Sequence, residues 1–246
     1  MSVFERCLEK CRARKGAVVY SDGEDRRVVS AAAKLIREGL VEPILIGDPE
    51  KVRAALQESG ETGVSLQVVN PYNPALLQHN AAEYMSIQKD KGKDISEEEA
   101  IKAVKNPLAA GALMVRRGEA EIGVAGNLSS TADVIRAGLR MVGTAAGSKT
   151  VSSFFFMLKD NNVCMFTDCA VIPEPTSAQL ADIAISTAGV YKRVMGDEAR
   201  VALLSFSTKG SAKHDNVSLV AEAVKIAKDK APELKLDGEL QFDAAL

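Results

Sequence analysis

The segment Ile122-Gly-Val-Ala-Gly-Asn-Leu-Ser-Ser-Thr-Ala-Asp-Val-Ile-Arg136 decides the fold, because it joins a buried strand, a hydroxyl-rich turn and a helix start. Gly126 has no Cβ atom, which allows a tight turn and a close approach of the backbone to a ligand. Ser130 suits the helix N-cap, and Asp133 stands three residues later, where a capping-box acid is expected. The apolar residues at helical spacing, which predict the buried face of this helix, are Ala132, Ile135, Leu139 and Val142.

The first turn of that helix is a candidate anion site. Free backbone N–H groups at a helix N-terminus, together with the helix dipole, suit a phosphate or a carboxylate. Because helical side chains lean toward the N-terminus, Arg136 can fold back over the same turn. The alternative is an ordinary capped helix with a surface arginine, and these residues alone favour neither interpretation.

The composition of the 246-residue chain indicates a globular protein without a basic field for nucleic acid or membrane lipid. Its formal net charge is −2, its hydrophobic content is 46%, and no apolar run approaches the roughly 20 residues of a membrane span. The N-terminus is charged and does not resemble a signal peptide. The four cysteines contain no Cys-x-x-Cys pair and the two histidines lie far apart, so we expect no metal site and a cytoplasmic protein with reduced thiols.

Strands and helices alternate through the first half of the chain, which predicts a parallel sheet with helices on its faces. The predicted strands are Ala17–Tyr20, Pro43–Ile46, Leu66–Val69 and Glu121–Ala125. Ligands of such sheets bind beyond the carboxyl ends of the strands, where the turns Ser21–Asp25 and Gly126–Thr131 both fall. Asp25 and Arg26 are therefore candidates for the same cleft, although capping and solvating the next helix is their simpler role.

The pattern changes near Gly143. Two β-rich runs, Val151–Leu158 and Val163–Phe166, flank the turn Lys159–Asn162 and predict an antiparallel hairpin. We therefore expect an α/β fold with two lobes, one spanning 1–143 around the parallel sheet and one spanning 144–246 with antiparallel strands.

The loop Ser207-Thr-Lys-Gly-Ser211 is a second candidate anion site, because it again joins a strand to a helix. Lys209 adds a positive charge and the hydroxyl groups add donors. The spacing of a nucleotide-binding P-loop is missing, and Ser/Gly loops after strands are often only turns, so the motif is weak by itself.

Three acids, Asp237, Glu239 and Asp243, stand two and four residues apart near the end of the sequence, and this alternation places them on one face of a predicted strand. They could act as cleft carboxylates for binding or proton transfer, or form the solvated face of an edge strand.

Taken together, three segments resemble phosphate acetyltransferases, most closely the branch found with ethanolamine utilisation. The resemblance follows the whole chain in order and is therefore more specific than any single motif. The matching segments are Gly126–Leu139, Leu204–Lys213 and Asp237–Ala245.

The resemblance implies an isocitrate/isopropylmalate dehydrogenase-like fold of two α/β lobes with an active cleft between them. It also implies a homodimer that transfers an acetyl group reversibly between acetyl phosphate and coenzyme A, with coenzyme A as a substrate and no metal or other cofactor.

The resemblance also implies the substrate-binding residues. Arg136 matches the family arginine associated with acetyl phosphate, and the turn before it matches the family's hydroxyl turn. Gln88 precedes Lys89-Asp-Lys-Gly92 where some relatives have an arginine, so that contact is not expected here. The implied substrate-binding residues are Asn127, Ser129, Ser130, Thr131, Arg136, Ser207, Thr208, Lys209, Gly210 and Ser211.

Members of the family continue beyond the Asp-Ala-Ala segment with a Ser-Arg-Gly motif and an aspartate that deprotonates the thiol of coenzyme A. We therefore expect a truncated chain whose first lobe lacks its completing segment and whose family base lies beyond Leu246. Three alternatives stay open: phosphate butyryltransferase activity, a non-catalytic fragment that binds ligand or dimerises, and, more remotely, a metal-dependent dehydrogenase of similar fold.

Overall fold

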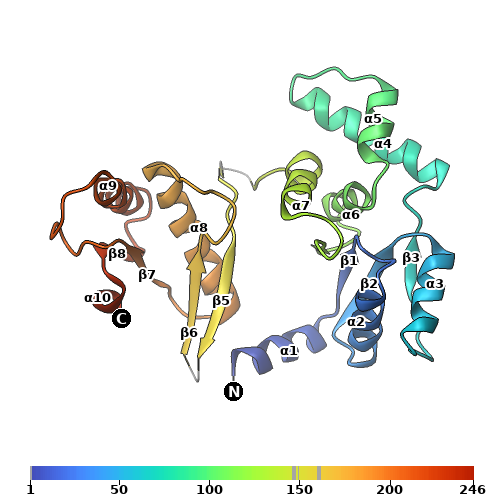
Figure 1. The fold of residues 1–246 in the computed structure, drawn as a ribbon, viewed down its shortest axis with the longest axis horizontal. Coiled ribbons are helices and arrows are strands. Elements are labelled where there is room, and N and C mark those ends of the chain that lie inside the picture. The colour runs from blue at the N-terminus through green and yellow to red at the C-terminus, as the bar shows by residue number, and fades with distance from the viewer. Residues whose placement is uncertain (1, 146–147, 149, 160–161) are drawn as a thin grey trace. The chain divides into compact units, whose positions relative to one another are not determined.

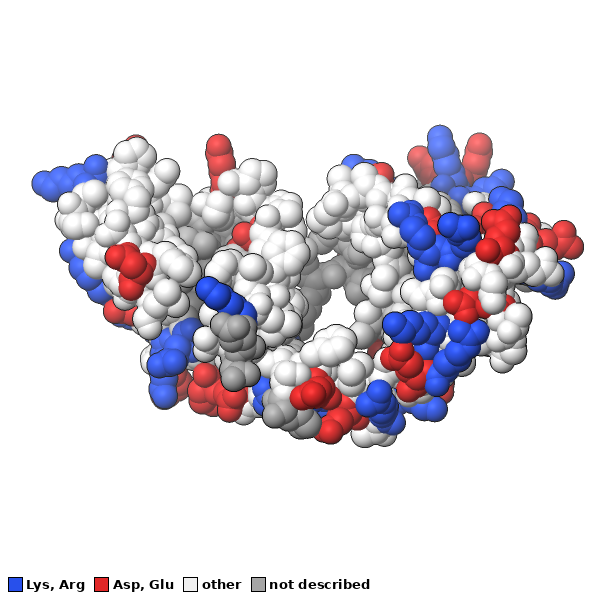
Figure 2. Space-filling view, turned by 60° about the horizontal axis from the view of Figure 1, so that its bottom comes forward, with Lys and Arg blue, Asp and Glu red and all other residues white. Residues whose placement is uncertain are grey.

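The computed structural model describes residues 2–145, 148, 150–159 and 162–246, which form two compact units (Figure 1). One unit comprises Glu5–Gly143, and the other comprises Thr144–Leu246 together with the N-terminal residues up to Phe4. Each unit has its own core and is described by itself. On the face drawn in Figure 2, Lys and Arg side chains are intermingled with Asp and Glu.

The Glu5–Gly143 unit contains the predicted parallel sheet, with strand order β3-β2-β1-β4. Val19 and Leu45, on the two central strands, are fully buried. The prediction of a buried strand at 122–124 is wrong, because among the described residues β4 is an edge strand paired with β1 alone, and Ile122 is 57% exposed. The strands are β1 Gly16–Tyr20, β2 Val41–Ile46, β3 Gln67–Val69 and β4 Ile122–Val124.

Side-chain caps start the helices of this unit. Asp25 accepts the backbone N–H of Arg27, and Asp48 accepts that of Glu50, each two residues into its helix. Such caps satisfy N–H groups that have no partner inside the helix. The helices are α1 Val3–Ala13, which begins in the other unit, α2 Arg26–Arg37, α3 Pro49–Glu58, α4 Pro74–Asp90, α5 Glu97–Val104, α6 Pro107–Arg116 and α7 Thr131–Ala137.

Ser130 is the N-cap of α7, as predicted, because its side chain accepts the backbone N–H of Asp133. The carboxylate of Asp133 accepts the hydroxyl of Ser130 at 2.7 Å. The helix is shorter than the sequence pattern suggested, since a π-helical turn, η1 Gly138–Val142, follows it.

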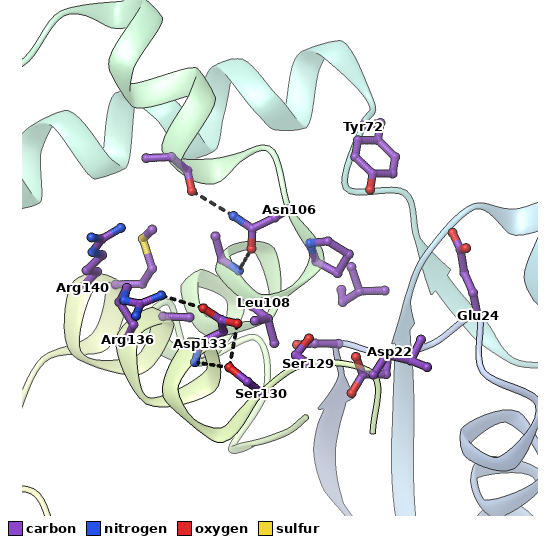
Figure 3. A pocket seen from close by; sticks show the side chains of 18 of the residues that line it. Asp22, Glu24, Tyr72, Asn106, Leu108, Ser129, Ser130, Asp133, Arg136 and Arg140 are labelled. Carbon is purple, nitrogen blue, oxygen red and sulfur yellow. Dashed lines mark hydrogen bonds and ion pairs between the residues drawn. The ribbon is translucent and has the colours of Figure 1, made fainter. Parts of the chain in front are cut away.

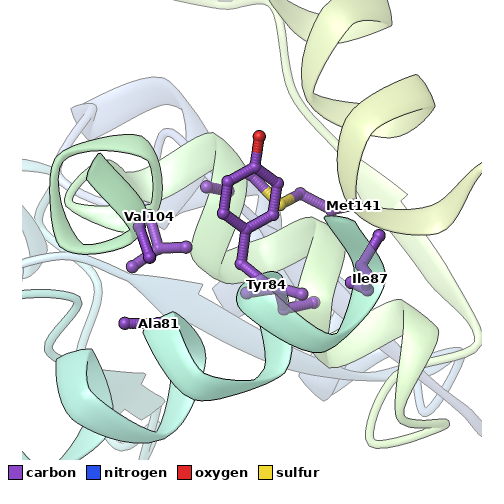
Figure 4. Packing of buried hydrophobic residues seen from close by; sticks show 8 residues of the cluster. Ala81, Tyr84, Ile87, Val104 and Met141 are labelled. Carbon is purple, nitrogen blue, oxygen red and sulfur yellow. The ribbon is translucent and has the colours of Figure 1, made fainter. Parts of the chain in front are cut away.

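The predicted buried face of this helix is wrong. Ala132 is exposed, and Leu139 and Val142 are 41% and 39% exposed. The wider π turn changes the angular positions of the residues that follow α7. Met141 is buried instead, in a cluster with Tyr84 and residues of α4, α5 and α6 (Figure 4).

The Thr144–Leu246 unit contains the predicted antiparallel hairpin of β5 and β6, although residues 160 and 161 of its turn lie outside the described part. Helices α8 and α9 pack with the parallel pair β7–β8, and Leu203, Ala223 and Ala227 lie in the core between them. The elements are β5 Phe154–Lys159, β6 Asn162–Thr167, α8 Ser177–Met195, β7 Arg200–Leu204, α9 Asp215–Lys230, β8 Lys235–Leu240 and α10 Phe242–Ala245.

Candidate active site

Asp22 joins the ends of two parallel strands. The backbone N–H of Ser21, just after β1, donates to the carbonyl of Val124 at the end of β4. One carboxylate oxygen of Asp22 accepts the N–H of Gly126 at 2.9 Å and that of Asn127 at 2.8 Å. Gly126 has a φ of 103°, a conformation that favours glycine. Asp22, which is 8% exposed, therefore fixes the turn that leads into α7.

A pocket of about 590 Å³ lies next to this turn, within the Glu5–Gly143 unit (Figure 3). Its walls come from the end of β1, the start of α6, the turn before α7, and α7 with η1. The polar and charged residues that line it are Ser21, Asp22, Glu24, Lys51, Tyr72, Asn106, Ser129, Ser130, Asp133, Arg136 and Arg140.

Arg136 folds back toward the N-terminus of α7, as predicted. Its guanidinium donates to Asp133 at 2.6 Å, and half of each side chain is exposed. The hydroxyl of Ser130 lowers the pKa of Asp133, and Arg136 adds to that effect. Figure 3 shows Arg136 and Asp133 on the same wall of the pocket. Arg136 is thus held by an internal carboxylate that an incoming anion would have to compete with.

The other charged residues of the pocket differ in their partners. Lys51 forms an ion pair with Glu24 at 3.1 Å, and Glu24 also accepts the backbone N–H of Asp48. Among the described residues, no acidic side chain lies within ion-pair distance of the guanidinium of Arg140. Arg140 was not among the residues expected from the sequence, although its spacing of four residues from Arg136 is a detectable pattern on a helix.

The residues expected for substrate binding in this unit do not all face the pocket. Ser129, Ser130 and Arg136 line it. Asn127 contributes its backbone N–H to the contact with Asp22, and Thr131 is exposed at the first position of α7; neither lines the pocket. Asp25 caps α2 and pairs with Arg27, which is the simpler of its two expected roles.

The second candidate loop, Ser207–Ser211, lies in the other unit and closes on an internal carboxylate. Glu239, which is 5% exposed, accepts the backbone N–H of Gly210 at 2.6 Å and the hydroxyl of Ser207 at 3.2 Å. Ser211 accepts the N–H of Thr208. The pKa of Glu239 is lowered chiefly by the N–H of Gly210. Glu239 thus occupies donors that the sequence had assigned to a substrate anion.

Lys209 is also engaged within its own unit. Its ammonium group lies 2.5 Å from Asp237 and donates to the carbonyl of Gly238. A pair that is half exposed on both sides is weakly held, so Lys209 can exchange partners. The contact with Lys209 is the main cause that lowers the pKa of Asp237 to about 2.

The prediction that Asp237, Glu239 and Asp243 share one strand face is wrong. Asp237 is about half exposed, whereas Glu239 is buried, because the pairing of β7 and β8 shifts register between Leu203 and Leu204. Asp243 lies beyond β8, in α10. A register shift moves side chains to the opposite face of a strand, and the sequence period does not reveal it.

Gln88 does not line the pocket; it is 7% exposed within α4. The neighbouring Lys91 instead donates to the backbone carbonyl of Arg140 at 3.4 Å. The C-terminal end of α4 therefore contacts the backbone of η1.

The described residues contain no group of three or more His, Cys, Asp or Glu side chains arranged to hold a metal ion. In the same part of the chain, every helix is too short or too polar to cross a membrane.

Comparison with known proteins gives one consistent result. The model of the family described as "Phosphate acetyl/butaryl transferase" matches residues 2–246. A phosphate acetyltransferase of Thermoanaerobacterium thermosaccharolyticum is 37% identical over 252 residues, covering all of this chain and 76% of that protein.

Solved structures agree with the sequence comparison. A phosphotransacetylase from Streptococcus pyogenes matches with a TM-score of 0.91 at 37% identity, covering 99% of this chain and 74% of that one. The EutD phosphotransacetylase from Staphylococcus aureus matches with a TM-score of 0.86 at 35% identity, over 98% and 73% of the two chains. This chain thus spans about three quarters of the length of these relatives.

Proposed function

The chain belongs to the phosphate acetyl/butaryl transferase family, and from this membership we propose that it is an acyltransferase that interconverts acetyl phosphate and acetyl-coenzyme A. We further propose that the pocket beside the 126–130 turn holds the phosphate of acetyl phosphate. The proposal rests on the position of Arg136, which lines the pocket together with Ser129 and Ser130.

The chemistry explains why the phosphate must be held. In the forward reaction the thiolate of coenzyme A attacks the carbonyl carbon of acetyl phosphate and forms the C–S bond. The C–O bond to phosphate then breaks, and phosphate leaves with the electron pair; the thiol has given its proton to a base before the attack. Hydrogen-bond donors and a guanidinium that hold the phosphate stabilise the negative charge that grows on the leaving group.

The pocket supports this role through its donors. Arg136 can form charge-assisted hydrogen bonds with phosphate oxygens once it leaves Asp133. The hydroxyl of Ser129 adds a neutral donor, whereas the hydroxyl of Ser130 is donated to Asp133 and becomes available only if it leaves that carboxylate. Asp22 fixes the backbone of the turn that carries both serines. A serine hydroxyl can rotate, so that of Ser129 can adapt to both the acyl phosphate and free phosphate.

The experiment incubates the purified 246-residue chain with acetyl phosphate and coenzyme A and follows thioester absorbance. Turnover that depends on both substrates is expected. A parallel assay with butyryl phosphate compares kcat/KM for the two acyl groups and tests the preference for acetyl. Absence of turnover with retained phosphate binding would instead favour a non-catalytic fragment that only binds ligand.

Acyl transfer of this type needs no resident cofactor, since the thiol is the nucleophile and phosphate is the leaving group. We therefore expect unchanged activity after dialysis against EDTA. We also place the protein in the cytoplasm, a proposal supported by Cys7, Cys11, Cys164 and Cys169, all of which are free thiols. Fractionation of the source cells tests the location.

A homodimer is a further part of the proposal. The β5–β6 hairpin exposes apolar side chains, among them Phe155 at 60% and Leu158 at 58% exposure. Exposed apolar patches mark interaction surfaces, and twofold symmetry is the commonest arrangement of identical chains. Light scattering measures the mass, and Phe155→Ser should shift it toward the monomer.

We also propose that the two units form the two lobes of the isocitrate/isopropylmalate dehydrogenase-like fold. The parallel sheet of one unit and the separate antiparallel hairpin of the other support this assignment. A structural superposition on members of that fold tests it.

A further inference from the structure

We propose that Arg140 is a second anion-binding residue of the pocket and holds a phosphate group of one of the two substrates. The proposal deepens the function proposed above and rests on it for the identity of the ligand. It is carried by the charges of the pocket and by the contacts that hold η1.

The first observation is that Arg140 differs from the other charged residues of the pocket. Lys51 is paired with Glu24, and Arg136 with Asp133. Asp22 directs one oxygen to two backbone N–H groups. Within the described residues the guanidinium of Arg140 has neither an ion pair nor a hydrogen bond. An incoming anion can therefore bind Arg140 without first displacing an internal carboxylate, whereas it must compete with Asp133 for Arg136.

The second observation is that the backbone under Arg140 is fixed. The neighbouring Met141 is 2% exposed and is buried among α4, α5 and α6 (Figure 4). Lys91 donates to the carbonyl of Arg140, and Arg116 donates to the carbonyls of Met141 and Val142 at 3.3 Å. These contacts satisfy carbonyl groups at the end of the helix and keep Arg140 on the pocket wall.

The third observation is the position of Arg140 beside Arg136. Figure 3 shows the two side chains next to each other at one end of the pocket, away from Glu24. Two neighbouring guanidinium groups suit a ligand that carries a dianionic phosphate or more than one phosphate, because each can bind two oxygens. Acetyl phosphate and coenzyme A both offer such groups, so the shared ligand chemistry is a phosphate ester or anhydride.

The test compares Arg140→Gln, Arg140→Lys and the wild-type full chain. Arg53→Gln is the matched control, because Arg53 is exposed on α3 in the same unit, does not line the pocket and has no ion pair with the described residues. Calorimetry measures the binding of inorganic phosphate, coenzyme A and 3′-dephospho-coenzyme A. Initial rates give KM for acetyl phosphate and for coenzyme A separately.

The expected result is that Arg140→Gln weakens binding of phosphate or of coenzyme A by about tenfold or more, with a similar rise in the corresponding KM and little change in kcat. Arg140→Lys should recover part of the loss. A loss seen with phosphate and acetyl phosphate assigns Arg140 to the acyl phosphate. A loss seen with coenzyme A but absent with its 3′-dephospho form assigns it to the 3′-phosphate.

Binding of phosphate and coenzyme A by Arg140→Gln that matches Arg53→Gln within twofold would overturn the inference. The proposed function fails separately, when the wild-type chain shows no turnover. Arg140-dependent phosphate binding without turnover would keep the inference and remove the function.

Discussion

One carboxylate oxygen of Asp22 lies 2.9 Å from the backbone nitrogen of Gly126, 104 residues further along the chain. This contact connects the turn after β1 to the turn after β4 and so shapes the wall of the pocket that carries Ser129 and Ser130. Two variants separate the role of the acceptor oxygen from that of the charge.

Asp22→Ala should lower stability and raise KM for acetyl phosphate, because it leaves the N–H groups of Gly126 and Asn127 without their acceptor. Each unsatisfied group costs about 1–3 kcal/mol. Asp22→Asn should be milder, since a single amide oxygen can accept both donors. Thermal unfolding and steady-state kinetics measure the two effects. Equal losses in both variants would show that the negative charge, rather than the acceptor geometry, is what matters.

Arg136→Ala should weaken acetyl phosphate binding by about 1.5–3 kcal/mol, because a charge-assisted contact is lost. KM for acetyl phosphate should rise, and KM for coenzyme A should change less. The folded state should be nearly unaffected, since the Arg136 side chain is 53% exposed. An unchanged KM for acetyl phosphate would contradict the assignment of Arg136 to the phosphate.

Asp133→Asn should act in the opposite direction. The amide oxygen can still accept the Ser130 hydroxyl, but the negative charge that competes for Arg136 is gone. A half-exposed ion pair is worth about 0.2–1 kcal/mol, so KM for acetyl phosphate should fall by up to about fivefold. The same kinetic assay measures it, and a rise in KM would mean that Asp133 positions Arg136 for the ligand.

The stability of the chain should fall on the acid side. The N–H of Gly210 is the first cause of the lowered pKa of Glu239, and Asp237 and Asp25 have pKa values lowered to about 2. These carboxylates bind fewer protons when folded than when unfolded. Their stabilising effect is present above the unfolded pKa values, near about 4, and is lost as pH falls through the folded values.

Unfolding midpoints measured from about pH 7 to about pH 2 test this dependence. Glu239→Gln should flatten the acid side of the curve, because glutamine does not titrate. A curve of the variant with the same slope as the wild type would show that Glu239 does not contribute. Asp243→Asn is a matched control, since Asp243 is exposed in α10 and forms no ion pair with the described residues.

The sequence determined the local elements and their order. The alternation of apolar strands with capped helices predicted the parallel sheet, and the runs around residues 160–161 predicted the hairpin of β5 and β6. Ser130 was identified as an N-cap from its residue type and spacing alone. Such features depend on residues close together in the chain, which is why a sequence pattern can reveal them.

Only the tertiary structure decided which of the candidate residues line the pocket. The π turn after α7 buries Met141 and places Arg140 in the pocket, and the register shift in β7–β8 buries Glu239 against the loop that the sequence had assigned to an anion. Asp22 acquires its role through contacts more than 100 residues away. The partner of a carboxylate or a guanidinium is set by long-range packing, and helical or strand periodicity carries no information about it.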